Sequence, residues 1–152
     1  MSGRGAVGKA FVIDASVTAT WLLPDEHDEA SQRVYARLRA ARLQLHAPEL
    51  WLWECGNIVA NGVKRARIAA ADAVLVWSVL DAIRTRVELA SFEPAQVRAC
   101  LLLAVDENLS IYDAAYLWLA LSQKVALLTH DAALAKAAVR QRVRVVRLED
   151  IA

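Results

Sequence analysis

The stretch that most constrains the fold is Phe11-Val12-Ile13-Asp14-Ala15-Ser16, in which three apolar residues lead directly to a carboxylate. A short run of apolar residues is typical of a buried strand in a parallel sheet. An unpaired carboxylate is costly in an apolar interior, so an acid at the end of such a strand needs a reason. Ligands bind at the carboxyl ends of strands in open α/β sheets, which makes Asp14 the first candidate site residue.

Further apolar runs alternate with helical patterns along the chain. Strands are predicted at Leu43–His46, Val87–Phe92, Val125–Leu128 and Val143–Leu148. Helices are predicted at 16–23 with Ser16 as the cap, 25–42, 48–63 opened by Pro48, 69–85, 94–107, 111–123, and 131–139 with Asp131 as the cap. This alternation predicts an α/β fold, with a central parallel sheet of four to five strands between two layers of helices.

The length of 152 residues fits one domain, which we place at residues 11–152 behind a flexible lead-in at residues 1–10. Residues 3–9 of the lead-in match the spacing of a phosphate-binding P-loop up to Lys9. Ala10 replaces the Ser or Thr that a P-loop needs next, and the segment precedes a strand instead of following one. A P-loop is therefore not predicted.

The composition excludes several classes of protein. The longest unbroken apolar run, Ala114–Leu121, is far shorter than a membrane helix requires, so the high apolar content indicates a filled core and an apolar partner surface. The net charge of +1 argues against a polybasic nucleic-acid binder. Cys55 and Cys100 lie far apart, which predicts reduced thiols in a cytoplasmic protein.

Four acidic residues occupy positions where a carboxylate is conspicuous. Asp14 ends the first strand, Glu54 lies within an apolar helical stretch, Asp113 begins the most apolar helix, and Asp131 follows the strand that ends at Leu128. Asp113 and Asp131 are about as easily explained as helix N-caps, a role compatible with binding a metal. Glu54 is the hardest to dismiss, because apolar helix faces seldom carry an unpaired Glu.

Together these acids predict a pocket of carboxylates. Four carboxylates repel one another unless some are protonated or a cation is bound. Oxygen ligands alone suit Mg²⁺ or Mn²⁺, and no group of Cys and His residues indicates zinc. Such an ion can activate water and stabilise charge on a phosphodiester.

These residues resemble a known family. Residues 12–17, 48–57, 109–116 and 128–131, together with Leu134, are similar in order and spacing to PIN-domain ribonucleases, most closely the VapC-type toxins of bacterial toxin–antitoxin pairs. The resemblance implies a PIN-like three-layer sandwich and Mg²⁺-dependent cleavage of RNA. It also implies a homodimer, and a cognate antitoxin that blocks the site.

By position, the resemblance assigns metal binding and catalysis to Asp14, Glu54, Asp113 and Asp131, with Glu54 either binding the metal or positioning the attacking water. It assigns supporting hydrogen bonds to Ser16, Thr129 and Asn57, and Asn57 shares a predicted helix face with Glu54. No other cofactor is implied.

Other side chains are candidates for partner contacts. Arg65 and Arg67, or the helix face with Arg33 and Arg37, are candidates for RNA phosphates, although solvated charge is the favoured explanation for any one of them. His130 is either near the substrate or an ordinary turn residue. Trp51 and Trp53 point to different faces of one helix, so one of them, with Trp21 or Leu22, is a candidate for a dimer or antitoxin surface. The alternative is that all five tryptophans lie in the core.

Two other functions remain open. A phosphatase could use Asp14 as a nucleophile, but such enzymes usually carry a second acid two residues on, where this chain has Ser16. A non-catalytic PIN-like interaction module would use the acids only as caps and surface charges.

Overall fold

The computed structural model describes residues 9–40 and 42–151, and five parallel strands form its central sheet. The strands lie in the order β3-β2-β1-β4-β5. Their bounds are β1 (Lys9–Ile13), β2 (Leu43–Pro48), β3 (Val87–Ala90), β4 (Ala126–Leu128) and β5 (Val145–Val146). The predicted parallel sheet of four to five strands is confirmed.

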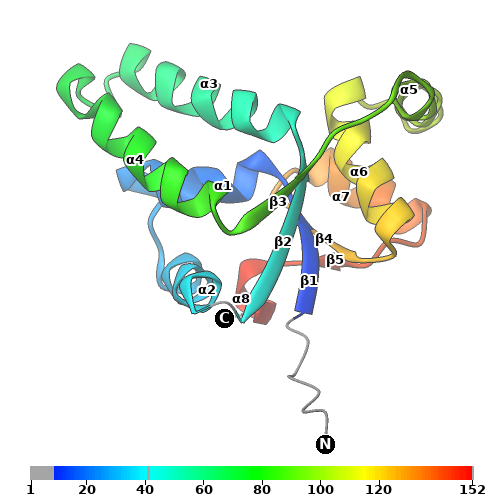
Figure 1. Cartoon of the computed structure of the whole chain (residues 1–152), viewed down its shortest axis with the longest axis horizontal. Coiled ribbons are helices and arrows are strands. Elements are labelled where there is room, and N and C mark those ends of the chain that lie inside the picture. Colours follow the sequence, from blue (N-terminus) through cyan, green and yellow to red (C-terminus); the bar gives the residue numbers. More distant parts are fainter. Residues whose placement is uncertain (1–8, 41, 152) are drawn as a thin grey trace, which may run out of the picture.

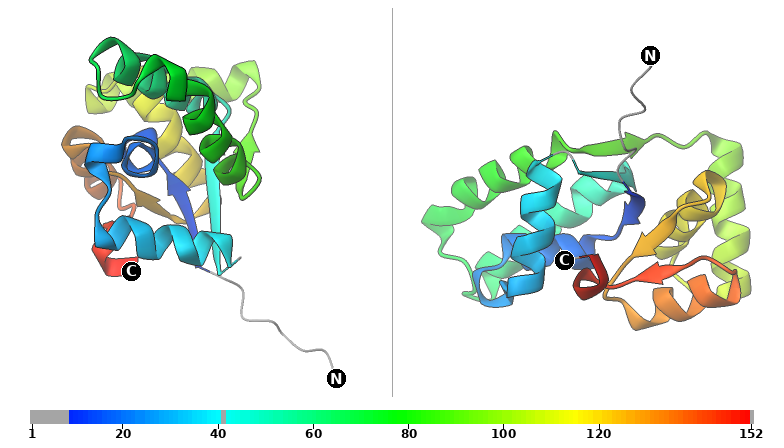
Figure 2. Two further views of the ribbon diagram at one scale, coloured as in Figure 1. Left: turned by 90° about the vertical axis from the view of Figure 1, so that its left-hand side faces the viewer. Right: turned by 90° about the horizontal axis from the view of Figure 1, so that it is seen from below.

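Helices cover both faces of the sheet. Their bounds are α1 (Ala15–Leu22), η1 (Pro24–Glu26), α2 (Glu29–Arg39), α3 (Leu50–Lys64), η2 (Ala70–Asp72), α4 (Ala73–Arg84), α5 (Pro94–Glu107), α6 (Ile111–Gln123), α7 (Ala132–Arg140) and α8 (Leu148–Ile151). Figure 1 shows α1 to α4 on one side of the strands and α5 to α7 on the other, which confirms the three-layer arrangement. The short α8 returns to lie beside α2 (Figure 2).

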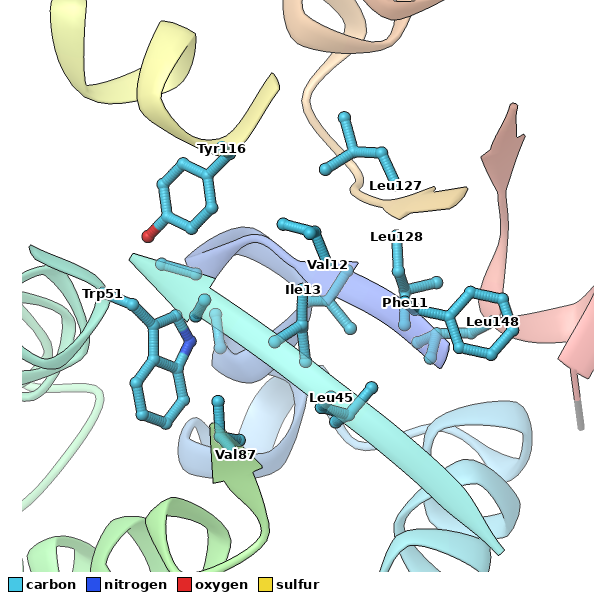
Figure 3. Packing of buried hydrophobic residues seen from close by; sticks show 14 of the residues in the cluster. Phe11, Val12, Ile13, Leu45, Trp51, Val87, Tyr116, Leu127, Leu128 and Leu148 are labelled. Carbon is cyan, nitrogen blue, oxygen red and sulfur yellow. The ribbon is translucent and has the colours of Figure 1, made fainter. Parts of the chain in front are cut away.

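The first strand is the centre of the core. Phe11, Val12 and Ile13 are at most 1% exposed. β1 pairs with β2 on one side and β4 on the other, so it lies in the middle of the sheet. Helices cover both faces there and shield the side chains of β1 from solvent (Figure 3). This placement explains why the strand is apolar throughout and does not alternate.

The chain turns from one half of the sheet to the other at β1. From β1 it continues outward through β2 and β3, and it later returns to the opposite side of β1 to form β4 and β5. Such a reversal in strand order leaves a crevice at the carboxyl ends of the two neighbouring strands. Asp14 follows β1 directly at this point.

Two predicted boundaries near the start of the chain are wrong. β1 begins at Lys9, two residues earlier than predicted, while residues 1–8, which include most of the predicted lead-in and of the P-loop-like segment, lie outside the described residues. α2 begins at Glu29 and not at Asp25, because Pro24 opens the separate 3₁₀ turn η1. Asp28 then caps α2 through the Ser31 backbone amide.

Two predicted helix starts also need correction. Pro48 does not open a helix but ends β2, where it pairs with Ala90 of β3. Ser16 does not cap α1: Asp14 holds the cap position without a side-chain cap bond, and Ser16 lies in the first turn. Both residues are common at helix starts, but here Pro48 is part of a strand and Ser16 follows the cap residue.

The predicted surface role of Trp21 or Leu22 is contradicted by their burial. Trp21 is 5% exposed and Leu22 is 2% exposed. The Trp21 indole N–H donates to the Ser31 carbonyl oxygen, and its ring packs against Tyr35. Both side chains belong to the core between α1 and α2.

Among the described residues, no helix has the length and apolarity needed to span a membrane.

Candidate active site

The carboxyl ends of β1 and β4 bring two predicted site segments together. Asp14 follows β1 and its backbone N–H donates to the Leu128 carbonyl oxygen at 3.0 Å. Leu128 is the last residue of β4, so Thr129 and Asp131 begin beside Asp14 although more than a hundred residues separate them in sequence. The parallel pairing of the two strands creates this proximity.

Asp14 is held by two hydroxyl groups. Its side chain is almost fully buried, and Oδ2 accepts hydrogen bonds from Ser16 Oγ at 2.6 Å and Thr129 Oγ1 at 2.8 Å. The two hydroxyl oxygens are themselves 3.4 Å apart. Both bonds fix the orientation of the carboxylate. Ser16 and Thr129, predicted as supporting hydroxyls, both contact the acid.

Thr129 also connects Asp14 to Asp131. Its Oγ1 accepts a hydrogen bond from the Asp131 backbone N–H at 3.0 Å. Asp131 Oδ1 in turn accepts from the Leu134 N–H at 2.7 Å, so Asp131 is the N-cap of α7 as predicted. The cap bond fixes the Asp131 side chain at the edge of the sheet, beside the end of β4.

Glu54 reaches the site from α3 on the other side of the strands. Its half-buried carboxylate accepts a hydrogen bond at Oε2 from the hydroxyl of Tyr116 on α6. Tyr116 is fully buried and was not predicted as a site residue. The signal that could have found it is its hydroxyl, because a buried Tyr usually hydrogen-bonds a partner.

Asp113 lies in the first turn of α6 and is not its cap. Ser110 is the cap, since its hydroxyl accepts a hydrogen bond from the Asp113 backbone N–H at 3.1 Å. α6 packs against β1, β2 and β4, so its first turn lies over the ends of the central strands. The Asp113 side chain is therefore available for contacts other than capping.

The electrostatics show that the four acids share one region. Burial raises the pKa of Glu54, and the charges of Asp14 and Asp113 raise it further, while the Tyr116 hydrogen bond opposes the shift. Burial likewise raises the pKa of Asp113, with added contributions from the charges of Asp14 and Asp131. Asp14 is thus the common neighbour of Glu54 and Asp113.

In three of the acids, one oxygen is already bound by the protein. Asp14 uses Oδ2, Glu54 uses Oε2 and Asp131 uses Oδ1. Their other oxygens accept no hydrogen bond from the residues that the structure describes. Each carboxylate thus retains one oxygen for a ligand from outside the protein.

The donor set suits a hard divalent ion in its chemistry. All four side chains offer oxygen, as Mg²⁺ and Mn²⁺ prefer, and those of Asp14, Glu54 and Asp131 are anchored by neighbouring hydrogen bonds. Within residues 9–40 and 42–151, however, no three His, Cys, Asp or Glu side chains are gathered closely enough to form a ready metal cluster. The carboxylates would have to move closer together to share one ion.

Asn57 lies three residues after Glu54 on α3, further round the helix toward Trp53. It is exposed and forms no hydrogen bond with Glu54 within the described parts of the chain. It lines a shallow apolar depression beside Trp53, Gly56, Ala60 and Trp77. The role of Asn57 in supporting the acidic residues therefore stays a prediction.

The two tryptophans of α3 separate as predicted, one inside and one outside. Trp51 is fully buried, and its indole N–H donates to Thr18 Oγ1 at 3.0 Å. Trp53 is 83% exposed and lies in the depression with Trp77 of α4.

Comparison with known families identifies the fold. The family model described as "PIN domain" matches residues 11–140, and the chain belongs to the PIN-domain family. PIN domains are generally nucleases, and they generally use divalent metal ions. The acidic crevice lies within the matched region.

Solved structures with the same fold include PAE2754 from Pyrobaculum aerophilum, with 22% identity and a TM-score of 0.69 over 97% of this chain and 95% of that one. VapBC2 from Rickettsia felis, bound to a DNA fragment from its promoter, has 13% identity and a TM-score of 0.63, covering 91% and 98%. FitAcB from Neisseria gonorrhoeae has 17% identity and a TM-score of 0.61, covering 91% and 97%. Comparison with curated proteins gave no match.

Proposed function

We propose that this protein is a Mg²⁺-dependent endoribonuclease, with Mn²⁺ as a substitute ion, and the toxin of a toxin–antitoxin pair. The observation that carries the proposal is Asp14, an almost fully buried carboxylate at the reversal point of the sheet, held by Ser16 and Thr129. Its charge acts on Glu54 and Asp113, and Thr129 links it to Asp131. Membership of a family that generally comprises nucleases supports the same conclusion.

The acidic residues and their hydrogen-bond partners would have different roles in cleavage. Asp14, Asp113 and Asp131 would bind the ion through carboxylate oxygens, and Glu54 would either bind it or orient the attacking water. When bound, the ion would supply an activated water and stabilise the developing charge on the phosphodiester. Ser16 and Thr129 would keep Asp14 oriented, and Tyr116 would hold one oxygen of Glu54 in place.

Cleavage of RNA by the purified protein tests this proposal. The protein is expected to cut structured RNA in Mg²⁺ and to stop when a chelator is added. Asp14→Asn keeps the size of the side chain but removes its charge, and is expected to abolish cleavage. Asp81→Asn, an exposed position on α4, is the matched control and should cleave normally. Equal activity of the two variants would overturn the assignment.

The two alternatives make different predictions. A phosphatase would release phosphate from small phosphate esters and form a trappable aspartyl-phosphate at Asp14. A non-catalytic module would show no cleavage, and its Tm would not change when Mg²⁺ or Mn²⁺ is added, since ligands that bind the native state stabilise it.

An antitoxin is the proposed protein partner. VapBC2 and FitAcB, two of the similar structures, are antitoxin–toxin complexes. This chain exposes Trp53, Leu75 and Trp77 on α3 and α4, which is unusual for a surface without a partner. Trp53→Ala would leave Tm nearly unchanged and weaken binding of the cognate antitoxin, as measured by calorimetry.

A homodimer is the second proposed association. Val97, Leu101, Leu102 and Val105 are exposed along α5, and together they form an apolar helix face. Leu101→Asp would place a charge on this face and is expected to convert a dimer into a monomer in light-scattering measurements. A wild-type monomer would contradict the dimer without affecting the proposed chemistry.

A further inference from the structure

A groove between α1 and α3 connects the acidic crevice to a cationic end. Ser16 and His130 line the groove at the crevice, and the His130 backbone N–H donates to Ser16 Oγ at 3.0 Å. Ala19 and Ile58 line its middle, and Arg65 lines it near the end of α3. α1 and α3 lie on the same side of the sheet (Figure 1), and the eight residues of α1 span about 12 Å.

The two arginines of this groove differ in how their charges are used. Arg67 donates to Asp25 from Nε and from one terminal nitrogen, each at 2.9 Å, and to Glu26 at 2.6 Å. These bonds attach η1 to the end of α3 and neutralise the guanidinium, so Arg67 has a structural role. Arg65 is exposed and forms no ion pair with any described residue.

The other arginines considered as phosphate ligands are also engaged. Arg33 pairs with Glu29 one turn away at 2.6 Å. Arg37 donates to the Ile151 carbonyl oxygen of α8. Arg65 is therefore the cation of the original candidates that remains unpaired beside a groove leading to Asp14.

We propose that this groove binds the RNA strand next to the cleaved phosphodiester, with Arg65 contacting a backbone phosphate. This inference rests on the proposed ribonuclease function and deepens it. RNA carries one negative charge per nucleotide, so a strand leaving an acidic crevice is stabilised by a cation along its path. Leu23 and Ile58 give the same groove an apolar lining against which a base or ribose can pack.

RNA binding measured without cleavage tests the groove. Fluorescence anisotropy of a labelled single-stranded RNA in EDTA reports affinity independently of activity. Arg65→Ala is expected to weaken binding about tenfold and to reduce the slope of log K against log salt by about 0.7, the value for one phosphate contact on a single strand. Arg65→Lys should retain most of the slope because it keeps the charge.

Arg86→Ala is the matched control. Arg86 is an exposed arginine that precedes β3, so it lies at the edge of the sheet opposite the carboxylates. Its loss removes the same charge and should leave the affinity and the salt slope unchanged. Equal effects of the two variants would overturn the proposal. No effect of Arg65→Ala on RNA binding would overturn it as well, and this is the result expected if the groove binds only a protein partner. Weakened binding by Arg65→Ala in a protein that fails to cleave RNA would support the groove and count against the catalytic proposal alone.

Discussion

Tyr116 and Glu54 form a hydrogen bond that joins the two helical layers at the candidate active site. Tyr116 projects from α6 with its hydroxyl directed away from that helix toward the strands and α3 (Figure 3), and it donates to Glu54 Oε2. The ring is fully buried, while the carboxylate is half-buried. The position of Glu54 is thus determined by a residue 62 positions away in sequence.

Tyr116→Phe tests the importance of this bond. The variant removes only a hydroxyl, so the ring should still fill its place in the core. Loss of a hydrogen bond behind a metal ligand typically lowers metal affinity or activity about 10- to 100-fold, and we expect that range for Mn²⁺ affinity by calorimetry and for the cleavage rate. Tyr35→Phe on α2 is the control. If both variants bind Mn²⁺ like the wild type, Tyr116 does not position a ligand.

Thr129→Val removes the hydroxyl that serves Asp14 and Asp131 together. Its loss leaves a buried carboxylate oxygen and the Asp131 amide with one partner fewer, so we expect destabilisation by about 1–3 kcal/mol in urea unfolding. Mn²⁺ affinity should also fall. Thr129→Ser restores the hydroxyl and should recover the affinity, whereas failure of this rescue would assign the effect to packing.

Asp113→Asn is expected to stabilise the metal-free protein at neutral pH. Burial raises the pKa of Asp113, and the charges of Asp14 and Asp131 add to the shift. Because the folded-state pKa lies above the unfolded value, the stability contributed by the protonated group is complete below the unfolded pKa and is lost as pH rises through the folded pKa. The Tm of the variant in EDTA should therefore exceed that of the wild type at pH 7, and the difference should vanish below pH 3.8.

Added Mn²⁺ supplies the control for this prediction. The wild type should gain more stability from the ion than Asp113→Asn, because the variant lacks one anionic ligand. A variant that is less stable than the wild type in EDTA at pH 7 would contradict the electrostatic account.

Two glycines of α3 offer a matched test of its packing. A Cβ at Gly62 would lie 2.9 Å from Ile68 Cδ1 and 3.1 Å from Leu23 Cδ2, so Gly62→Ala should destabilise the protein by about 1–3 kcal/mol. A Cβ at Gly56 would lie at an ordinary 3.5 Å from the Trp77 ring. Gly56→Ala should stabilise by about 0.5–1 kcal/mol through helix propensity alone. Equal effects in urea unfolding would show that this packing is wrong.

The sheet and most helices could be predicted because their signals are local. Apolar runs marked the strands, and α5 and α6 lie within the predicted bounds. Errors arose where one residue type serves two purposes. Pro48 is common at helix starts, but as the last residue of β2 it pairs with Ala90. Whether it opens a helix or ends a strand depends on β3, which lies forty residues further along the chain.

The candidate site was predictable in its acids and less so in its supporting contacts. Asp14 and Asp131 follow buried strands, so parallel topology alone places them at one edge of the sheet. Tyr116 was missed because its contact depends on how α6 faces α3, which no local pattern specifies. Asn57 shows the converse: helical spacing places it beside Glu54, but no hydrogen bond joins the two among the described residues, and Asn57 lines the depression with Trp53.

The proposed function requires that Asp14 and its neighbouring acids hold a divalent ion for RNA cleavage. Anomalous diffraction from a crystal soaked in Mn²⁺ tests it most directly. We expect a peak within bonding distance of Asp14 and Asp113, on the oxygen of Asp14 that Ser16 and Thr129 leave free. Full occupancy by Mn²⁺ elsewhere, with no peak beside Asp14, would contradict it.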